Sequence, residues 1–187
     1  MKNVKVKDVV KILESGGVVM HPTETCYGLA VDVMNEGGLK KLYEVKGRDF
    51  NKPVSMFVAD LEMAQKYGVF SEKALELAKK YWPGALSIVV PRTEELPAFF
   101  NKGEKFVSMR VSGDEFCREM VKELGRPVTT TSANMAGEPE LYEAKTLEGV
   151  DLVVDGGKIE TRKPSTIVKV VGNEVEVLRQ GDVKVLI

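Results

Sequence analysis

Short apolar runs of strand length alternate with helix-like stripes along the first two thirds of the sequence, and this order restricts the fold more than any other feature. Residues 6–13 carry valines and a leucine at helical spacing, and Gly16-Gly17 follows as a stop signal. The apolar run 18–20 then fits a short buried strand, which Pro22 ends. Because strand–helix–strand order requires crossover connections, some of the strands must pair in parallel.

The same patterns place the remaining elements. Helices are expected around 39–43, at 74–81 with Ser71 as the N-cap, and at 117–124. Further strands are expected at 26–33, 54–59, 85–90, 106–112, 127–132, 151–155, 165–171 and 174–179. The last two lie close together around the turn signal Gly172-Asn173, which predicts a hairpin. Since no repeat or linker is found, residues 1–187 are expected to form a single α/β domain with a twisted, mixed sheet and flanking helices.

The charge balance argues against a surface made for duplex nucleic acid. Lys and Arg number 27 against 28 Asp and Glu, which gives a net charge of −1, and the pI is about 6.0. Proteins that bind duplexes usually carry a broad basic face and a high pI, so an RNA partner would have to be met by a local patch.

The histidine and cysteine content limits the kinds of catalytic site that the chain can form and indicates the redox state of its compartment. His21 is the only histidine, so a Ser-His-Asp triad or a zinc site has little to draw on. Cys26 and Cys117 lie far apart and form no CxxC pair, so a reducing compartment is expected. The N-terminus shows no signal-peptide pattern, and no apolar run reaches the ~20 residues that a membrane span needs. We therefore expect a cytoplasmic protein with no membrane partner.

Two hydroxyl-rich segments are too polar for the strands they adjoin, and such mismatches often mark functional sites. The first, HPTETCYGL at 21–29, follows a buried strand and could direct hydroxyls and backbone N–H groups into a crevice, although a plain hydrogen-bonded turn is the alternative. The second, TTTSAN at 129–134, turns abruptly after a strand and offers neutral donors and acceptors. Threonine is also common in strands because of its β-propensity, so the run of threonines alone does not indicate a functional site. The abrupt turn into Ser-Ala-Asn is the more informative part of the segment.

Cationic segments are candidates for binding an anion. KGRDFNKP at 46–53 sets three cations around a flexible turn, which suits a triphosphate but also a solvated loop. Arg110 lies inside the strand-like SMRV, where it would either form a structural salt bridge or clamp a carboxylate in a pocket. PST at 164–166 and LRQG at 178–181 are weaker signals. The chain has no GxxxxGK[ST] and no GxGxxG, so any ATP site lacks a Walker loop.

In this order, PTETCYGL, KGR…KP, SMRV, TTTSAN, PST and LRQG resemble the motifs of the YrdC-type threonylcarbamoyl-AMP synthases over residues 17–181. The resemblance implies an α/β sheet curved around a concave, positively charged cleft. It also implies a nucleotidyltransferase that condenses L-threonine, bicarbonate and ATP to threonylcarbamoyl-AMP and pyrophosphate. Downstream threonylcarbamoyl-transferase proteins would then modify adenosine 37 of tRNA. ATP is thus a substrate, with Mg2+ bound through its phosphates and no metal ligand supplied by the protein.

The resemblance also assigns residues. Those implied to bind ATP are Lys46, Arg48, Lys52, Ser132, Asn134, Glu140 and Arg179, of which Lys46, Arg48, Ser132 and Asn134 are implied to be catalytic. Those implied to surround threonine are Thr23, Arg110, Thr130 and Ser165, with Arg110 pairing with the carboxylate. Two residues depart from the family pattern: Asp49 stands where proline is frequent, and His21 stands where an aromatic or aliphatic residue is expected. We assign His21 no catalytic role.

Two other interpretations remain open. The same fold could serve as a non-catalytic module that binds structured RNA, which leaves a direct RNA contact open, or as another carbamoylating or adenylating enzyme. The stretch 93–105, with Pro97 and Gly103, is one candidate for a mobile loop that closes over the site.

Overall fold

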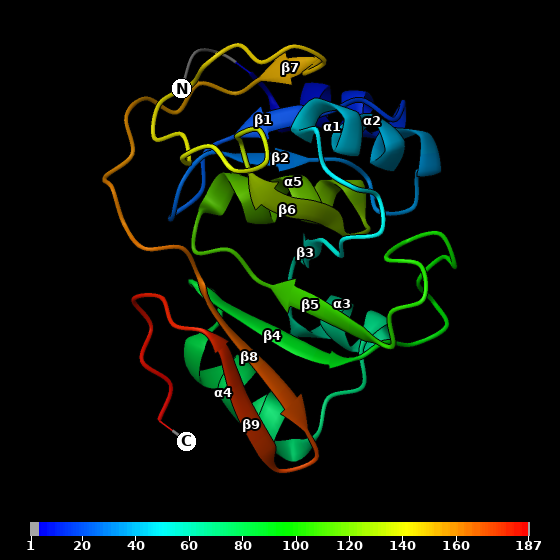
Figure 1. The fold of residues 1–187 in the computed structure, drawn as a ribbon, viewed down its shortest axis with the longest axis vertical. Helices are drawn as coiled ribbons and strands as arrows, with labels where there is room; N and C mark the ends of the chain where they lie inside the picture. Colours follow the sequence, from blue (N-terminus) through cyan, green and yellow to red (C-terminus); the bar gives the residue numbers. More distant parts are fainter. Residues whose placement is uncertain (1–3, 187) are drawn as a thin grey trace.

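The computed structural model describes residues 4–186, which form a nine-stranded mixed sheet in the order β7-β1-β2-β6-β3-β5-β4-β8-β9 (Figure 1). The strands are β1 (Val19–His21), β2 (Gly28–Ala30), β3 (Ser55–Phe57), β4 (Leu86–Pro91), β5 (Phe106–Arg110), β6 (Val128–Ser132), β7 (Leu152–Val153), β8 (Thr166–Val171) and β9 (Glu174–Arg179). The helices are α1 (Val6–Glu14), α2 (Glu36–Lys46), α3 (Leu61–Tyr67), α4 (Glu72–Tyr81) and α5 (Glu115–Leu124). The predicted α/β class with a mixed sheet and flanking helices is confirmed.

Parallel and antiparallel pairs are interspersed in the sheet. The pairs β1–β7, β3–β5 and β4–β8 are parallel, and the other neighbours are antiparallel. The parallel pairs confirm the crossovers expected from the strand–helix order. β8 and β9 form the expected antiparallel hairpin, and Gly172 in its turn has φ 58°, a conformation that glycine adopts without strain.

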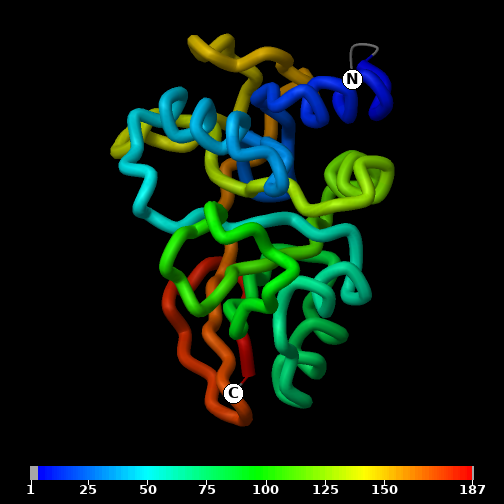
Figure 2. The backbone as a smooth tube through the Cα atoms, turned by 90° about the vertical axis from the view of Figure 1, so that its right-hand side faces the viewer, coloured from blue at the N-terminus to red at the C-terminus, as the bar shows by residue number. Residues whose placement is uncertain are grey.

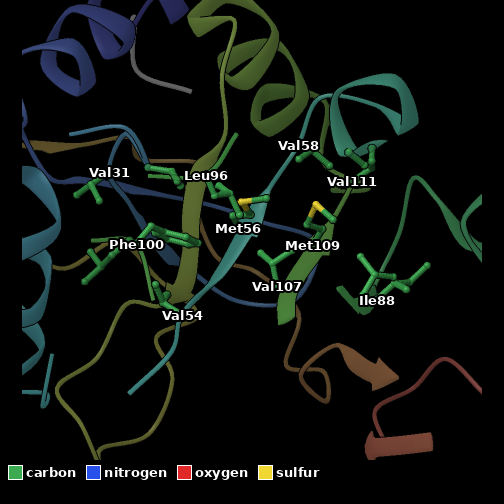
Figure 3. Packing of buried hydrophobic residues seen from close by; sticks show 14 of the residues in the cluster. Val31, Val54, Met56, Val58, Ile88, Leu96, Phe100, Val107, Met109 and Val111 are labelled. Atoms are coloured by element: carbon green, nitrogen blue, oxygen red, sulfur yellow. The ribbon is translucent and has the colours of Figure 1, made fainter. Parts of the chain in front are cut away.

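Helices cover both faces of the half of the sheet that contains β1 and β2. α1 and α5 pack against each other on one face, where Leu13 and Met120 are buried in one hydrophobic cluster. α2 lies on the opposite face (Figure 2), where Leu39 belongs to the main core. Figure 3 shows the centre of that core, with Met56 and Met109 on the paired strands β3 and β5. Each face of this half is therefore closed by its own apolar layer.

Side-chain caps explain where four of the helices begin. The side chains of Asn35, Asp60, Ser71 and Asp114 each accept the backbone N–H of the residue three positions ahead. The Ser71 cap expected from the sequence is thereby confirmed. Gly47 ends α2 in the left-handed conformation. Across residues 4–186, every helix falls short of the length and apolarity that a membrane crossing requires.

Three expectations from the sequence need correction. α3 was not predicted, because a helix with only Ala64 buried has no apolar stripe to detect. The strands expected at 26–33 and 151–155 shorten to β2 and β7. In the first case the backbone N–H of Tyr27 donates to the carbonyl of Leu141 in a loop, so it is not available to a neighbouring strand.

The stretch 93–105 is anchored to the core. Leu96 and Phe100 are buried, and Figure 3 shows both among the residues of the main core. The guanidinium of Arg92 donates to the carbonyl oxygens of Phe100 at 2.7 Å and of Leu96 and Pro97 at 3.0 Å. No residue of the stretch 93–105 lines either candidate ligand pocket at the strand ends. The geometry therefore gives no support to this stretch as a loop that closes over the site.

Asn101 adds to this anchoring, because its side-chain amide pairs with the backbone of Val54 as a neighbouring strand would. Its Oδ1 accepts the Val54 N–H and its Nδ2 donates to the Val54 carbonyl, both at 2.9 Å. Asn101 has φ 46°, which asparagine tolerates better than most residues. Because Val54 directly precedes β3, this contact fixes where the cationic loop 46–53 joins the sheet.

We expect Asn101→Gly to lower the free energy of unfolding by about 2–3 kcal/mol, because both polar backbone groups of Val54 lose a buried partner. Glycine is chosen because it adopts φ 46° without strain, so the loss reports the hydrogen bonds. Urea denaturation measures the change. Asn173→Gly, in the exposed turn of the β8–β9 hairpin, is the control and should shift stability by less than about 0.5 kcal/mol. Equal effects of the two changes would contradict the role given to Asn101.

Candidate functional site

Strand β6 brings the two hydroxyl-rich segments to one place. It pairs with β2, where Gly28 lies opposite Ser132, and with β3, where Ser55 lies opposite Thr130. The polar end of β6 therefore lies between the loop that precedes β2 and the cationic loop that precedes β3. The backbone hydrogen bonds of these two ladders therefore bring together segments that are distant in the sequence.

Two adjoining pockets open at this meeting point. The strand-end pocket, of ≈ 310 Å³, is lined by Thr23, Thr25, Cys26, Gly28, Arg48, Pro53, Val54, Ser55, Ser87, Arg110, Thr130, Thr131, Ser132, Glu140, Pro164, Ser165, Ile167 and Arg179. The turn pocket, of ≈ 320 Å³, is lined by Lys46, Arg48, Lys52, Thr131, Ser132, Asn134, Ala136 and Gly137. The two share Arg48, Thr131 and Ser132. Every residue that the resemblance implies for ATP or threonine lines one of these pockets or both.

Arg110 presents a buried cation to the strand-end pocket. Only 5% of its side chain is exposed, and its Nε is buried without an acceptor. Its Cζ lies 4.7 Å from the centre of the Phe57 ring, and its Nη1 lies 3.6 Å from Oε1 of Glu24, which is beyond hydrogen-bond distance. The ring and the carboxylate stabilise the charge, while no acceptor among residues 4–186 takes its N–H groups. Because Arg110 lines the strand-end pocket, the terminal N–H groups that reach this pocket are available to a ligand.

Glu24 is the anionic partner of Arg110 and lines neither pocket. Its Oε2 accepts a hydrogen bond from the Ser112 hydroxyl at 2.5 Å. Burial raises the pKa of Glu24, but the Arg110 guanidinium, the Ser112 hydroxyl and backbone N–H groups lower it by more, so the carboxyl titrates below its usual range. Glu24 therefore remains charged at neutral pH and compensates the Arg110 cation.

Thr23 uses its hydroxyl to shape the loop after β1. Its Oγ1 accepts the backbone N–H groups of Thr25 at 3.0 Å and Cys26 at 3.2 Å, and it donates to the Cys26 carbonyl at 2.7 Å. Such hydroxyl-bonded turns are a frequent use of threonine. Burial raises the pKa of the Cys26 thiol, so this side chain lines the pocket in its neutral form.

Arg179 reaches from β9, at the edge of the sheet, to Ser165. Its Nε donates to the Ser165 carbonyl at 2.9 Å and its Nη2 to the Ser165 hydroxyl at 3.0 Å. The Ser165 hydroxyl also lies 3.2 Å from that of Ser87. Since all three line the strand-end pocket, Arg179 both fixes the PST segment and adds a cation to the pocket wall.

The turn pocket is built around the ammonium of Lys46. Its Nζ donates to the Ser132 carbonyl at 2.6 Å, to the Asn134 carbonyl at 2.9 Å and to Asn134 Oδ1 at 3.1 Å. Asn134 Oδ1 also accepts from the Ser132 hydroxyl at 2.5 Å, and Asn134 Nδ2 donates to the Glu138 carbonyl at 2.5 Å. Burial, followed by repulsion from Arg48, lowers the pKa of Lys46 to about 8. The TTTSAN segment is therefore held by a network with a lysine at its centre.

The other cations of the loop 46–53 form fewer hydrogen bonds with the protein than Lys46 does. Arg48 Nη2 donates to the Pro53 carbonyl at 2.9 Å, and the Lys52 ammonium is exposed and has no partner in the described part of the chain. Asp49 lines neither pocket, because its Oδ1 accepts the backbone N–H of Asn51 at 2.9 Å and the Asn51 side chain at 3.1 Å. The carboxylate that departs from the family pattern is thus bound within its own turn.

His21 lies outside both pockets and is fully buried. Its Nδ1 lies 2.9 Å from the Pro22 carbonyl, to which it donates, and 3.2 Å from the Cys117 sulfur. Burial lowers the pKa of His21 below its usual value, which keeps the ring neutral. These contacts are those of a core residue, and the absence of a catalytic role stays a prediction.

Sequence reasoning missed the residues that support Arg110. Phe57 lies opposite Arg110 in the parallel β3–β5 pair, and Ser112 positions Glu24. Neither residue stood out in the sequence, because its position beside Arg110 or Glu24 depends on contacts between distant segments that hydrophobic periodicity does not reveal. Glu24 could have been found, since a carboxylate between two threonines directly after a buried strand needs a cationic partner.

A mixed α/β sheet with arginine, lysine and hydroxyl side chains converging at strand ends is an arrangement that suits small anionic ligands. A family model for Sua5, YciO and YrdC proteins, described as "Telomere recombination", matches residues 11–181. The chain therefore belongs to the Sua5/YciO/YrdC family.

Individual relatives agree with this assignment. A protein of Methanocaldococcus jannaschii named "Putative threonylcarbamoyl-AMP synthase" is 32% identical over 176 residues, which cover 91% of this chain and 83% of the relative. A threonylcarbamoyl-AMP synthase of Bacillus subtilis is 31% identical, over 96% of this chain and 54% of the relative. The crystal structure of Pyrococcus abyssi Sua5 complexed with L-threonine has a TM-score of 0.88 at 28% identity, over 94% of this chain and 54% of that one. The chain thus spans about half the length of the last two.

We expect Glu24→Gln to lower the free energy of unfolding at neutral pH by about 2–4 kcal/mol, because it leaves a buried guanidinium without its counter-ion. The folded-state pKa of Glu24 lies below its unfolded value, so its contribution is present above the unfolded pKa and is lost as the pH falls through the folded pKa. Denaturant unfolding from pH 7 to the acid limit of folding should therefore show the wild type and the variant converging. Glu123→Gln, on the exposed side of α5, is the control, and a gap that stays constant with pH would contradict the ion pair.

Proposed function

We propose that the chain condenses L-threonine, bicarbonate and ATP into threonylcarbamoyl-AMP and pyrophosphate. The names of its curated relatives and the threonine complex of Pyrococcus abyssi Sua5 support this activity. The two adjoining pockets support it as well, because one is lined by Arg110, whose guanidinium suits a carboxylate, and the other by the cations Lys46, Arg48 and Lys52, which suit phosphates.

Arg110 is the observation that carries the proposal. A buried guanidinium whose Nε lacks an acceptor among the described residues is costly, and a ligand in the pocket that Arg110 lines would supply acceptors to its terminal N–H groups. The planar fork of arginine matches a carboxylate with two parallel N–H···O bonds, as the carboxylate of threonine would offer. The hydroxyls of Thr23, Thr130 and Ser165 line the same pocket and would surround the rest of the amino acid.

The turn pocket would receive the triphosphate. Arg48 lines both pockets, so it would lie between the amino acid and the phosphates, with Lys52 farther out. Ser132, which lines both pockets, and Asn134, which lines the turn pocket, would contact the nucleotide or the carboxylate derived from bicarbonate. Arg179 and Glu140 line the strand-end pocket and would contact the nucleotide from that side. Lys46 lines the turn pocket with Arg48 and would hold the phosphates from the same side.

The chemistry needs positioning and charge neutralisation more than a protein nucleophile. The amine of threonine attacks the carbon of bicarbonate and forms an N-carboxylate with loss of water. An oxygen of that carbamate then attacks the α-phosphorus of ATP, and the bond to the bridging oxygen breaks to release pyrophosphate. Both partners of the second step are anionic, so arginine and lysine side chains that hold them together supply the main part of the catalysis.

Further elements of the proposal concern partners and compartment. Mg2+ would be carried by the phosphates of ATP, and Glu140 is the one acidic side chain among the residues that line the two pockets. The product would pass to threonylcarbamoyl-transferase proteins that modify tRNA, and a direct contact with RNA remains part of the alternative function. Two free cysteines, Cys26 and Cys117, agree with a cytoplasmic location.

We expect Arg110→Ala to raise the KM for threonine by about 100-fold or more, since the substrate carboxylate loses its charged partner. The KM for ATP should change much less, because Arg110 lines only the strand-end pocket. Pyrophosphate release at varied threonine and ATP concentrations gives both constants. Arg162→Ala removes an exposed arginine that lines neither pocket and is the control. Unchanged dependence on threonine in Arg110→Ala would remove the role given to this residue.

The same assay separates the proposed function from its alternatives. Pyrophosphate release that requires ATP, threonine and bicarbonate together supports the synthase, and release without threonine indicates another adenylating or carbamoylating enzyme. A module that only binds structured RNA would release none and would instead bind RNA with a steep salt dependence. Serine in place of threonine tests how far the pocket distinguishes the two amino acids.

A further inference from the structure

The imidazole of His21 carries a buried hydrogen-bond acceptor that the protein leaves unused. Its Nδ1 lies 2.9 Å from the Pro22 carbonyl, which can only accept, so the proton of the neutral ring is on Nδ1. Nε2 therefore has a free lone pair. It is fully buried and has no hydrogen-bond partner among residues 4–186. Such an acceptor costs free energy that a suitably placed donor would recover.

Gly28 lies between this acceptor and the strand-end pocket, which it lines. It is opposite His21 in the β1–β2 ladder, so both residues have their Cβ positions on the same face of the sheet. A Cβ on Gly28 would lie 3.5 Å from His21 Nε2, 3.3 Å from the Thr131 carbonyl oxygen and 3.6 Å from Thr23 Cγ2. Glycine therefore leaves a space for about one heavy atom, and two of the three nearest atoms around it are acceptors.

The backbone does not require glycine at this position. Gly28 is not left-handed, so another residue could adopt its conformation. What the missing side chain provides is the space beside Gly28, through which a ligand in the strand-end pocket can approach His21 Nε2.

Arg110 is close to the same space. The Phe57 ring contacts both side chains: its centre lies 4.7 Å from Arg110 Cζ and 6.1 Å from the centre of the His21 ring. Among residues 4–186, the buried side-chain nitrogen and oxygen atoms without a partner belong to His21, Glu24, Ser108 and Arg110. Because buried polar groups are normally paired, this concentration around Arg110 is typical of a site that a ligand completes. A ligand with its carboxylate on Arg110 can direct its side chain toward the space beside Gly28.

Threonine carries the group that suits this space. Its hydroxyl is a donor, and it is attached to the carbon next to the one that bears the carboxylate and the amine. The carboxylate is taken by Arg110, and the amine is needed for the attack on bicarbonate. The hydroxyl is then the donor that remains for Nε2.

We propose that His21 is a specificity-determining residue whose Nε2 accepts a hydrogen bond from the threonine hydroxyl in the space beside Gly28. The inference rests on the proposed function for the identity of the substrate. The role is recognition and involves no proton transfer. Burial lowers the pKa of His21, so the ring is neutral at neutral pH and keeps its lone pair.

Valine is the informative competitor, because a methyl group replaces the hydroxyl at nearly the same volume. It would leave Nε2 without a donor and set an apolar group against two acceptors. Sites that hydrogen-bond a substrate hydroxyl reject such analogues strongly. We expect the wild type to bind threonine about 100-fold or more tightly than valine in calorimetric titrations.

His21→Leu tests the contact, since leucine is apolar, fits the core and is too short to fill the space beside Gly28. It should weaken threonine by about tenfold or more and leave valine unchanged, because only the hydroxyl loses its partner. Cys117→Ala is the matched control. It removes the sulfur 3.2 Å from Nδ1 of the same buried ring but keeps Nε2, so the ratio of threonine to valine affinity should stay as in the wild type.

NMR reports the contact without a mutation at His21. As the chain has a single histidine, the nitrogen signal of Nε2 is unambiguous. Saturating threonine should move it upfield as Nε2 accepts the hydrogen bond, and saturating valine should not. Gly28→Ala fills the space with a methyl group whose nearest neighbour is 3.3 Å away, and should abolish this shift.

Two results would overturn the inference: an unchanged ratio of threonine to valine affinity in His21→Leu, or an Nε2 signal that threonine does not move. If His21→Leu fails to fold, the NMR measurement on the wild type decides. A wild type that binds threonine through His21 but releases no pyrophosphate would refute the proposed function alone. One that forms the product with the Nε2 signal unmoved would refute this inference alone.

Discussion

Strand β6 is hydrogen-bonded on both sides, and the rest of the site follows from that constraint. Its ladder with β2 sets Ser132 opposite Gly28, and its ladder with β3 sets Thr130 opposite Ser55. A shift of one residue in either ladder would turn the alternating side chains to the other face of the sheet. The register therefore decides that threonine and serine hydroxyls enter the pockets, and the apolar layers on the two faces of the sheet hold the register in place.

The cations around the pockets fall into two groups that differ in burial and in the protein groups that compensate their charge. Arg110 and Lys46 are buried, and each is balanced in its own way: Arg110 by a carboxylate and an aromatic ring, Lys46 by neutral oxygens. Arg48 and Lys52 lie nearer the solvent and keep most of their donors. A buried ion needs compensation before any ligand arrives, whereas an exposed one is compensated by water. This division separates the cations that the protein already compensates from those that water compensates.

Much of this arrangement is predictable from local sequence, and the remainder depends on pairings between distant segments. Gly172-Asn173 and the Ser71 cap are local signals, and both lead to the elements that the structure contains. The helix α3 carries only one buried residue, so periodicity could not detect it. For the candidate site, ordered motifs indicated which residues gather, but not the direction in which each side chain points. Lys46 illustrates the difference, because its place in the turn pocket followed from the motif while its inward-facing ammonium did not.

Arg179 gives the edge of the sheet a part in ligand binding. Within residues 4–186, β9 pairs with β8 alone, and edge hairpins open with less free energy than central strands. When β9 separates, the strand-end pocket loses one of its arginines, and Ser165 loses the two bonds that restrain it. A ligand that contacts both residues must therefore make local unfolding of this hairpin less favourable, by an amount that grows with its occupancy. A strand at the edge of the sheet would in this way report whether the site at the ends of the central strands is filled.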